Sequence, residues 1–131
     1  MRNTFLIFSF LGLICAGSSF AEQSCDNVEQ FKEISHEQLV NHIADRSAVI
    51  IDVNSEGSFQ EHHVTGAIHY GTEKDHFAQV LPKNKKMRVI AYCGGPKCTA
   101  WQKAAKAACE LGYTNIRHYK PGIKGWIASQ K

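Results

Sequence analysis

The chain has 131 residues, of which 44% are hydrophobic and 21% are charged, and this composition suits one compact globular domain with little room for a second. The net charge is only +3, and the lysines are scattered apart from a small group at Lys83, Lys85 and Lys86. Because nucleic-acid-binding proteins usually carry a denser basic face, the composition argues against a nucleic-acid partner.

The N-terminus has the pattern of a secretory signal peptide. Arg2 supplies a positive charge, residues 5–16 form an apolar run that is short for a bilayer span, and Ser19 and Ala21 are small residues at the positions that signal peptidase reads. We expect cleavage after Ala21, so that residues 1–21 are removed and the mature chain is periplasmic or secreted, without stable membrane insertion. The alternative is an uncleaved anchor helix.

The predicted domain begins after a short polar lead-in at residues 22–30. Residues 31–34 alternate apolar and polar side chains, which is typical of a short strand. Ser35 and Gln38 have the spacing of a capping box, which predicts that a helix begins there. Residues 48–51 are a continuous apolar run, which favours a strand buried on both faces, as in a parallel sheet.

The rest of the chain continues this alternation of strands and helices. Thr99 and Gln102 have the spacing of a second capping box, so we expect a helix to begin at Thr99 and to end at Gly112. Together the patterns predict an α/β fold with a central parallel sheet of about five strands and helices on both faces. The further strands are expected at residues 66–70, 88–92 and 115–119, and the further helices at residues 72–81 and 123–129.

Cys93 comes directly after the predicted strand at residues 88–92, at the edge of the sheet where α/β proteins bind ligands. Gly94 and Gly95 have no side chains, so their N–H groups can approach an anion closely. The dipole of the following helix and the charge of Lys97 also favour an anion there. These features are expected to lower the pKa of the Cys93 thiol and to stabilise a negatively charged group on its sulfur, such as a persulfide.

The other cysteines allow a second interpretation of this thiol. Cys15 leaves with the signal peptide, so the mature chain keeps Cys25, Cys93, Cys98 and Cys109. In an oxidising compartment four thiols allow three full disulfide pairings, and the sequence does not choose among them. Cys93 is therefore either functional, or a buried strand cysteine, or half of a disulfide with Cys98. Cys109 lies on the apolar face of its predicted helix, where we expect an inert core thiol.

Four blocks, in conserved order and spacing, resemble the rhodanese-like domain family, and the resemblance covers about residues 31–129. It implies that residues 31–131 form a rhodanese-like domain. The blocks are VIIDV at 49–53, similar to the family's "IDVR" strand; EHHVTGAI at 61–68, similar to "GHIPGA"; YCGGPKCT at 92–99, similar to the active-site loop; and LGYTNI at 111–116 followed by GIKGW at 122–126, similar to the "LGY-N-V … GGI-W" ending.

The resemblance implies a sulfurtransferase. Cys93 would accept the outer sulfur of a donor such as thiosulfate or polysulfide, hold it as a persulfide, and pass it to a thiophilic acceptor such as a thiol. Two displacement steps of this kind are covalent catalysis with ping-pong kinetics, and they require no cofactor and no metal. The loop that would bind the persulfide consists of Gly94, Gly95, Pro96, Lys97, Cys98 and Thr99.

Two positions depart from the family pattern. Cys98 stands where the loop commonly has an arginine, and Asn54 replaces the arginine of "IDVR". Both changes remove cations that would hold an anionic donor, which leaves thiosulfate open as the donor. One alternative is a thiol–disulfide or sulfur-carrier protein in which Cys98 resolves a persulfide or sulfenic acid on Cys93. Another is a non-catalytic binding module. Phosphate-ester hydrolysis is not expected, because the related phosphatase loop needs an arginine at the position of Thr99.

Four further side chains have two interpretations each. Asp52 either accepts hydrogen bonds from the Cys93 loop and fixes its shape, or caps the turn that follows its own strand. His62 and His63 suggest a metal site, but no matching Cys/His spacing surrounds them, so we expect no metal. The family resemblance instead implies a packing role for His63. Trp101 either lines the mouth of the pocket or packs in the core.

Overall fold

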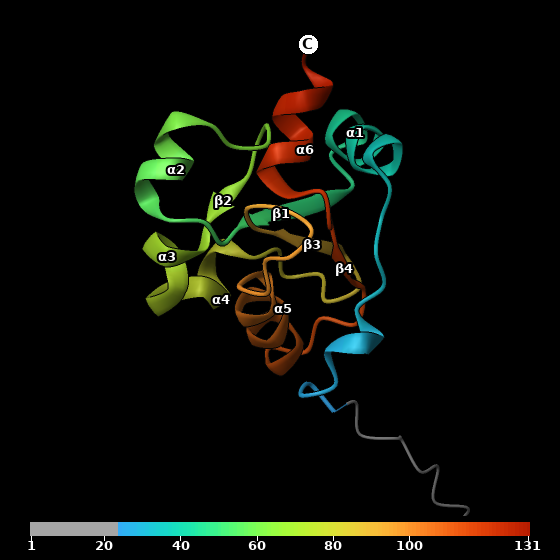
Figure 1. The fold of residues 1–131 in the computed structure, drawn as a ribbon. Helices are drawn as coiled ribbons and strands as arrows, with labels where there is room; N and C mark the ends of the chain where they lie inside the picture. The colour runs from blue at the N-terminus through green and yellow to red at the C-terminus, as the bar shows by residue number, and fades with distance from the viewer. Residues whose placement is uncertain (1–23) are drawn as a thin grey trace, which may run out of the picture.

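The computed structural model describes residues 24–131, and the expected signal peptide at residues 1–21 lies outside them. The centre of the fold is a parallel sheet with the strand order β2-β1-β3-β4 (Figure 1). Within the described residues no helix is long and apolar enough to cross a membrane. The strands are β1 (Ala48–Asp52), β2 (Ile68–His69), β3 (Arg88–Tyr92) and β4 (Ile116–His118).

Helices cover both faces of this sheet (Figure 1), which confirms the predicted α/β class. α1 (His36–Asp45) and α6 (Gly122–Ser129) lie on one face, and α5 (Trp101–Glu110) lies on the other. The short elements are η1 (Val28–Gln30), α2 (Glu56–Glu61), α3 (Tyr70–Glu73), η2 (Lys74–His76) and α4 (Phe77–Val80).

Strand β3 is apolar from Val89 to Tyr92, and the packing of its two faces explains why. Successive side chains of a strand point to opposite faces. Val89 and Ala91 pack in the cluster that contains the buried face of α5, whereas Ile90 and Tyr92 pack in the cluster that contains Leu39 of α1. Because helices bury both faces, neither face carries polar side chains at these positions. The strand ends in the middle of the sheet's carboxyl edge, where the chain continues into the Cys93 loop.

The sheet has fewer strands than the predicted five. The segment predicted as a strand at residues 31–34 forms a single parallel bridge, between Glu33 and His118. Ile34 N–H donates to the His118 carbonyl at 3.0 Å. The pairing ends there because Ser35 is the N-cap of α1, with the predicted capping box to Gln38, and its backbone already turns into the helix.

Two helix predictions were wrong in detail. The helix expected at residues 72–81 is divided into α3, η2 and α4. The buried anchors of this stretch, Phe77 and Leu81, both lie in its second half, whereas residues 71–76 between Tyr70 and Phe77 contribute no side chain to the core cluster. The capping box expected at Thr99 is absent. α5 begins at Trp101, and Ala100 occupies the N-cap position in helical conformation without a side-chain hydrogen bond. The Thr99 carbonyl instead accepts a hydrogen bond from Gln102 N–H at 3.1 Å.

The expectation of an inert thiol at Cys109 was also wrong. Cys109 is bonded to Cys25, so the lead-in before η1 is joined covalently to α5. The apolar face of α5 that suggested core packing does bury Cys109, which is 6% exposed. The lead-in covers the same face, because Val28 packs against this core cluster, and it thereby brings Cys25 within bonding reach.

Candidate functional site

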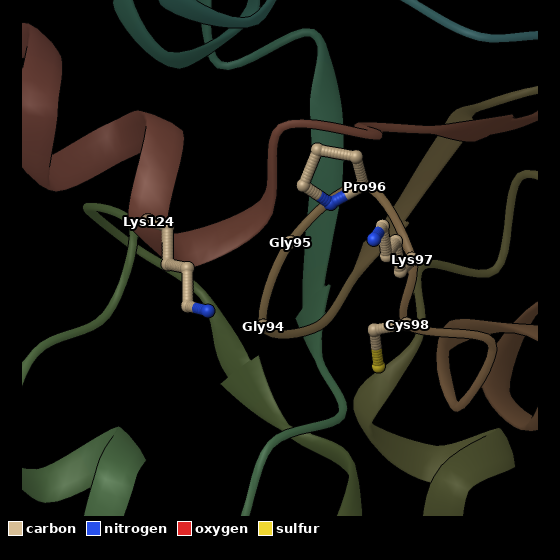
Figure 2. Close-up of a pocket in the computed structure, with 6 residues that line it drawn as sticks. All are labelled: Gly94, Gly95, Pro96, Lys97, Cys98 and Lys124. Carbon is tan, nitrogen blue, oxygen red and sulfur yellow. The ribbon is translucent and has the colours of Figure 1, made fainter.

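The candidate site lies where β3 ends and α6 begins. Cys93 follows β3 directly and is only 2% exposed. The loop after it and one lysine of α6 line an open cleft of about 470 Å3 (Figure 2). The lining residues are Gly94, Gly95, Pro96, Lys97, Cys98 and Lys124.

The first turn of α6 holds the loop from behind. Ile123 N–H donates to the Cys93 carbonyl at 2.9 Å, and Lys124 N–H donates to the Gly94 carbonyl at 3.2 Å. Gly122 makes this approach possible, because it has a φ of +62° and a Cβ there would lie 2.5 Å from the Cys93 carbonyl oxygen. The free N–H groups at the start of a helix are therefore used to fix the shape of the Cys93 loop.

Cys93 and Cys98 are joined by a disulfide in this structure. The bond closes the loop on itself, and Cys98 N–H also donates to the Gly95 carbonyl at 3.1 Å within it. Cys98 lines the cleft, whereas Cys93 is buried and is not among the lining residues. Of the possibilities that the sequence left open, the structure therefore has the oxidised Cys93–Cys98 pair, together with Cys25–Cys109.

The cleft has the groups that bind an anion. In the part of the chain that the structure describes, the backbone N–H groups of Gly94, Gly95, Lys97 and Thr99 donate to no protein acceptor. The ammonium groups of Lys97 and Lys124 form no ion pair with any described carboxylate. Lys124 extends from α6 beside the loop (Figure 2), and its Cδ lies 3.4 Å from the position of a Cβ on Gly95. Unpaired N–H donors and cations around one space favour a small anionic ligand.

Asp52 stabilises the turn after its own strand, which is the second of its two predicted roles. Its fully buried carboxylate accepts hydrogen bonds from Asn54 N–H at 2.7 Å and Asn54 Nδ2 at 2.8 Å. The Tyr92 hydroxyl donates to the other carboxylate oxygen and accepts from Val64 N–H at 2.9 Å. Burial, and then the hydrogen bond to Asp52, raise the pKa of Tyr92 far above its usual range.

Asn54 brings this buried network to the loop. Its side-chain oxygen lies 3.7 Å from the position of a Cβ on Gly94. Its backbone carbonyl accepts a hydrogen bond from Nε2 of His69 at 2.9 Å, and Nδ1 of His69 lies 2.8 Å from the Thr72 hydroxyl oxygen. His69 was not predicted as a site residue. Its position at the carboxyl end of a predicted strand was the available signal.

The other histidines near the site have packing roles. His63 stacks on Phe59, with ring centroids 4.1 Å apart, and its Nδ1 lies 2.7 Å from the Phe59 carbonyl oxygen.

Trp101 does not line the cleft. It is buried and stacks on His118, with ring centroids 3.8 Å apart. Burial lowers the pKa of His118 to about 4, an effect that Lys120 strengthens and Glu33 opposes. His118 gave no sequence signal beyond its place at the end of a strand.

Comparisons with known proteins agree with this architecture. A family model described as the rhodanese-like domain matches residues 35–129. The thiosulfate sulfurtransferase GlpE of Shewanella oneidensis is 28% identical over 100 residues, which cover 76% of this chain and 95% of that protein. The protein of the same name from Coxiella burnetii is 27% identical over 99 residues, which cover 75% of this chain and 89% of that protein.

Two solved structures share the fold at lower identity. The human single-domain sulfurtransferase TSTD1 superposes with a TM-score of 0.62 at 20% identity, over 76% of this chain and 97% of that one. The BH2092 protein of Bacillus halodurans gives a TM-score of 0.61 at 23% identity, over 78% and 75% of the two chains. The family match covers most of the described residues and includes the loop after β3 and the start of α6. The chain therefore belongs to the family of rhodanese-like domains.

Proposed function

We propose that this chain is a sulfurtransferase in which reduced Cys93 takes a sulfane sulfur from a small anionic donor. The Cys93 thiolate attacks the outer sulfur of the donor. With thiosulfate, a bond forms between Cys93 Sγ and the outer sulfur, and the sulfur–sulfur bond of thiosulfate breaks with loss of sulfite. A thiophilic acceptor then takes the outer sulfur and regenerates the thiolate. The names of the GlpE relatives support thiosulfate as one donor, and polysulfide is the other donor class proposed.

The arrangement of the cleft is the observation that carries this proposal. Buried Cys93 is bonded to Cys98, which lines the cleft together with Lys97 and Lys124, and the lining loop carries N–H groups without a protein acceptor. A persulfide anion on Cys93 would replace no existing hydrogen bond there, because the described chain offers these donors no acceptor. The two lysines supply the positive charge that Asn54 and Cys98 do not.

Mass spectrometry tests this function directly. The protein is first reduced, the reductant is removed under anaerobic conditions, and thiosulfate or polysulfide is added. We expect Cys98→Ala to gain the mass of one sulfur atom and Cys93→Ala to gain none. Subsequent addition of cyanide should remove the sulfur as thiocyanate. The absence of any sulfur gain in Cys98→Ala, with either donor, would contradict the proposal.

The Cys93–Cys98 disulfide favours a second candidate, a thiol–disulfide carrier that exchanges electrons rather than sulfur. In that case an oxidised partner would remove two hydrogens from the reduced chain, and no variant would gain sulfur. Either Cys93→Ala or Cys98→Ala alone would abolish the exchange. The same mass spectra therefore separate the two candidates.

We also propose that the chain is exported, because the expected signal peptide precedes the described residues. An oxidising compartment would maintain both disulfides. Expression of the full chain in a bacterium and N-terminal analysis of the periplasmic protein test this proposal. We expect the mature chain to begin at Glu22. Retention of residues 1–21 in the membrane fraction would contradict it.

A further inference from the structure

We propose that Cys98 resolves the Cys93 persulfide and expels its outer sulfur as hydrosulfide, so that the chain is a dithiol-dependent sulfane-sulfur reductase. This inference rests on the proposed function, because it needs the persulfide to form. It goes further by assigning the fate of the sulfur and the chemistry that must follow. An external sulfur acceptor becomes unnecessary, and an external reductant becomes necessary.

The disulfide shows that the two sulfur atoms can meet. In the structure Cys93 Sγ is bonded to Cys98 Sγ, with their Cα atoms 6.3 Å apart. Cys93 Sγ is also the inner sulfur of the proposed persulfide. A Cys98 thiolate formed by opening this bond therefore lies within one loop of the atom that it must attack. The other two described cysteines, Cys25 and Cys109, are joined to each other and do not compete.

Burial favours this internal attack over attack by an external thiol. Cys93 is 2% exposed, so a large thiol reaches its Sγ poorly. Cys98 belongs to the same short loop, and a tethered nucleophile of this kind acts at a high effective concentration. A small donor can still enter, and hydrosulfide can leave, through the cleft of about 470 Å3 that Cys98 lines (Figure 2). Lys97 and Lys124 at that cleft favour a leaving group that departs as an anion.

The step balances in atoms and electrons. The Cys98 thiolate forms a bond to Cys93 Sγ, and the bond from Cys93 Sγ to the outer sulfur breaks. The outer sulfur leaves with the bonding electron pair and takes one proton to become hydrosulfide. The two cysteine thiols are thus oxidised to a disulfide, and the sulfane sulfur is reduced by two electrons. A dithiol then reduces the Cys93–Cys98 disulfide, becomes a disulfide itself and returns the chain to its starting state.

A single-turnover experiment tests the inference. Reduced wild-type protein, freed of reductant, is mixed anaerobically with thiosulfate and no acceptor. Hydrosulfide is then trapped with monobromobimane. We expect one hydrosulfide per chain and a protein that has regained the Cys93–Cys98 disulfide. The observed first-order rate constant of release should not depend on protein concentration. With dithiothreitol present, hydrosulfide release should become catalytic.

Cys98→Ser is the decisive variant. It should release no hydrosulfide and should keep the extra sulfur on Cys93. Because trypsin cleaves after Lys97, the two cysteines fall on separate peptides, and the alkylated persulfide can be assigned to its residue. Cys98→Ala is the second variant if Cys98→Ser folds poorly, as judged by circular dichroism.

The outcomes are distinguishable from failure of the proposed function. If Cys98→Ser holds the persulfide but the wild type holds it equally long and releases no hydrosulfide, the inference is overturned and the sulfurtransferase remains. Hydrosulfide release by Cys98→Ser at the wild-type rate also overturns it. So does an observed first-order rate constant of the wild type that rises in proportion to protein concentration. If neither protein acquires sulfur from thiosulfate or polysulfide, the proposed function fails, and the inference fails with it.

Discussion

At the scale of single residues, the candidate site obtains its positive charge from two lysines on different elements, the loop after β3 and α6. The sequence lacks the two arginines that the family pattern would place at Asn54 and Cys98. Lys97 remains in the loop, and Lys124 lines the same cleft from the first turn of α6. Lys124 is exposed and forms no ion pair with a described carboxylate, so its charge is available to a ligand. We therefore expect Lys124 to take part in the recognition of an anionic donor.

Replacement of Lys124 tests this role. Lys124→Gln should lower the second-order rate of persulfide formation from thiosulfate by about two- to fivefold at low salt, the effect of one exposed charge pair. The effect should disappear in 1 M salt, where the Debye length is only about 3 Å. Alkylation of Cys93 by neutral iodoacetamide should be unchanged.

Lys120→Gln is the matched control, because it removes the same charge from a nearby position where Lys120 pairs with Glu33 at 3.0 Å. We expect it to leave the thiosulfate rate close to that of the wild type. Equal losses in the two variants would show that Lys124 contributes only to the net charge. An equal loss of iodoacetamide reactivity in Lys124→Gln would show that it acts on the thiol rather than on the donor.

At the scale of secondary-structure elements, backbone hydrogen bonds join the loop directly to α6. The hydrogen bonds from Ile123 and Lys124 to the loop carbonyls require the close approach that Gly122 allows. A second glycine with positive φ, Gly112, follows α5 at +93° but has open space around the position of a Cβ. The two glycines therefore separate two physical effects. At Gly112 a side chain meets only an unfavourable backbone conformation, whereas at Gly122 it also collides with the site.

Alanine substitutions at the two glycines should therefore differ in their effects on stability and on persulfide formation. Gly112→Ala should cost about 1 kcal/mol of unfolding free energy, the usual cost of a left-handed conformation for a residue with a Cβ, and should leave persulfide formation intact. Gly122→Ala should cost more and should slow persulfide formation by at least about tenfold, because displacement of the loop misplaces the reacting groups. Urea unfolding measures the first effect, and the mass-spectrometric assay measures the second, with Cys98→Ser added to all proteins so that the persulfide is retained. Wild-type rates in Gly122→Ala would show that the contact with α6 does not matter for the site.

The contact between β4 and α5 makes stability depend on pH. His118 is buried against Trp101, and its pKa is lowered from 6.5 to about 4. Unfolding therefore allows this imidazole to bind a proton between those two pH values, and the unfolded state is favoured as the pH falls below 6.5. Of the charged groups near it, Glu33 favours the protonated form and Lys120 disfavours it.

His118→Phe tests this dependence, because phenylalanine retains the stacking surface without the titratable group. Between pH 7 and pH 5, the wild type should lose about 2 kcal/mol more unfolding free energy than the variant. Urea titrations at the two pH values measure this difference. The remaining titratable groups are common to both proteins and cancel. Parallel losses in the two proteins would exclude His118 as the source.

At the scale of the whole molecule, local patterns could predict the sheet but not the contacts between distant segments. β1 and β3 were predictable, because strands buried on both faces leave continuous apolar runs. Cys93 was predictable as a candidate from the strand, turn and glycines around it. The approach of Lys124 was not, because only the folded position of α6 brings it to the loop. The disulfide partners were not predictable either, since pairing depends on distances in space.

The two disulfides act on very different lengths of chain. Cys25–Cys109 joins residues 84 positions apart, whereas Cys93–Cys98 joins residues 5 positions apart. The loss of chain entropy in the unfolded state grows with the length of the closed loop, so the long connection should stabilise the fold by about 4–5 kcal/mol and the short one by about 2 kcal/mol. The long disulfide lies at the Glu110 end of α5, away from the Cys93 loop. We therefore expect the Cys25–Cys109 disulfide to stabilise the fold and the Cys93–Cys98 pair to carry the chemistry.

Replacement of each pair tests this division. Cys25→Ser/Cys109→Ser should lower the unfolding free energy by about 2–5 kcal/mol, the range seen when native disulfides are removed. With Cys98→Ser added to both proteins so that the persulfide is retained, it should form the Cys93 persulfide as fast as the protein with Cys25 and Cys109 intact. Cys93→Ser/Cys98→Ser is the matched control and should show the smaller stability loss with no persulfide at all. Urea unfolding under non-reducing conditions and mass spectrometry provide the two measurements. A larger stability loss in the second variant would contradict the entropic account, because loop length would then not determine which disulfide stabilises the fold.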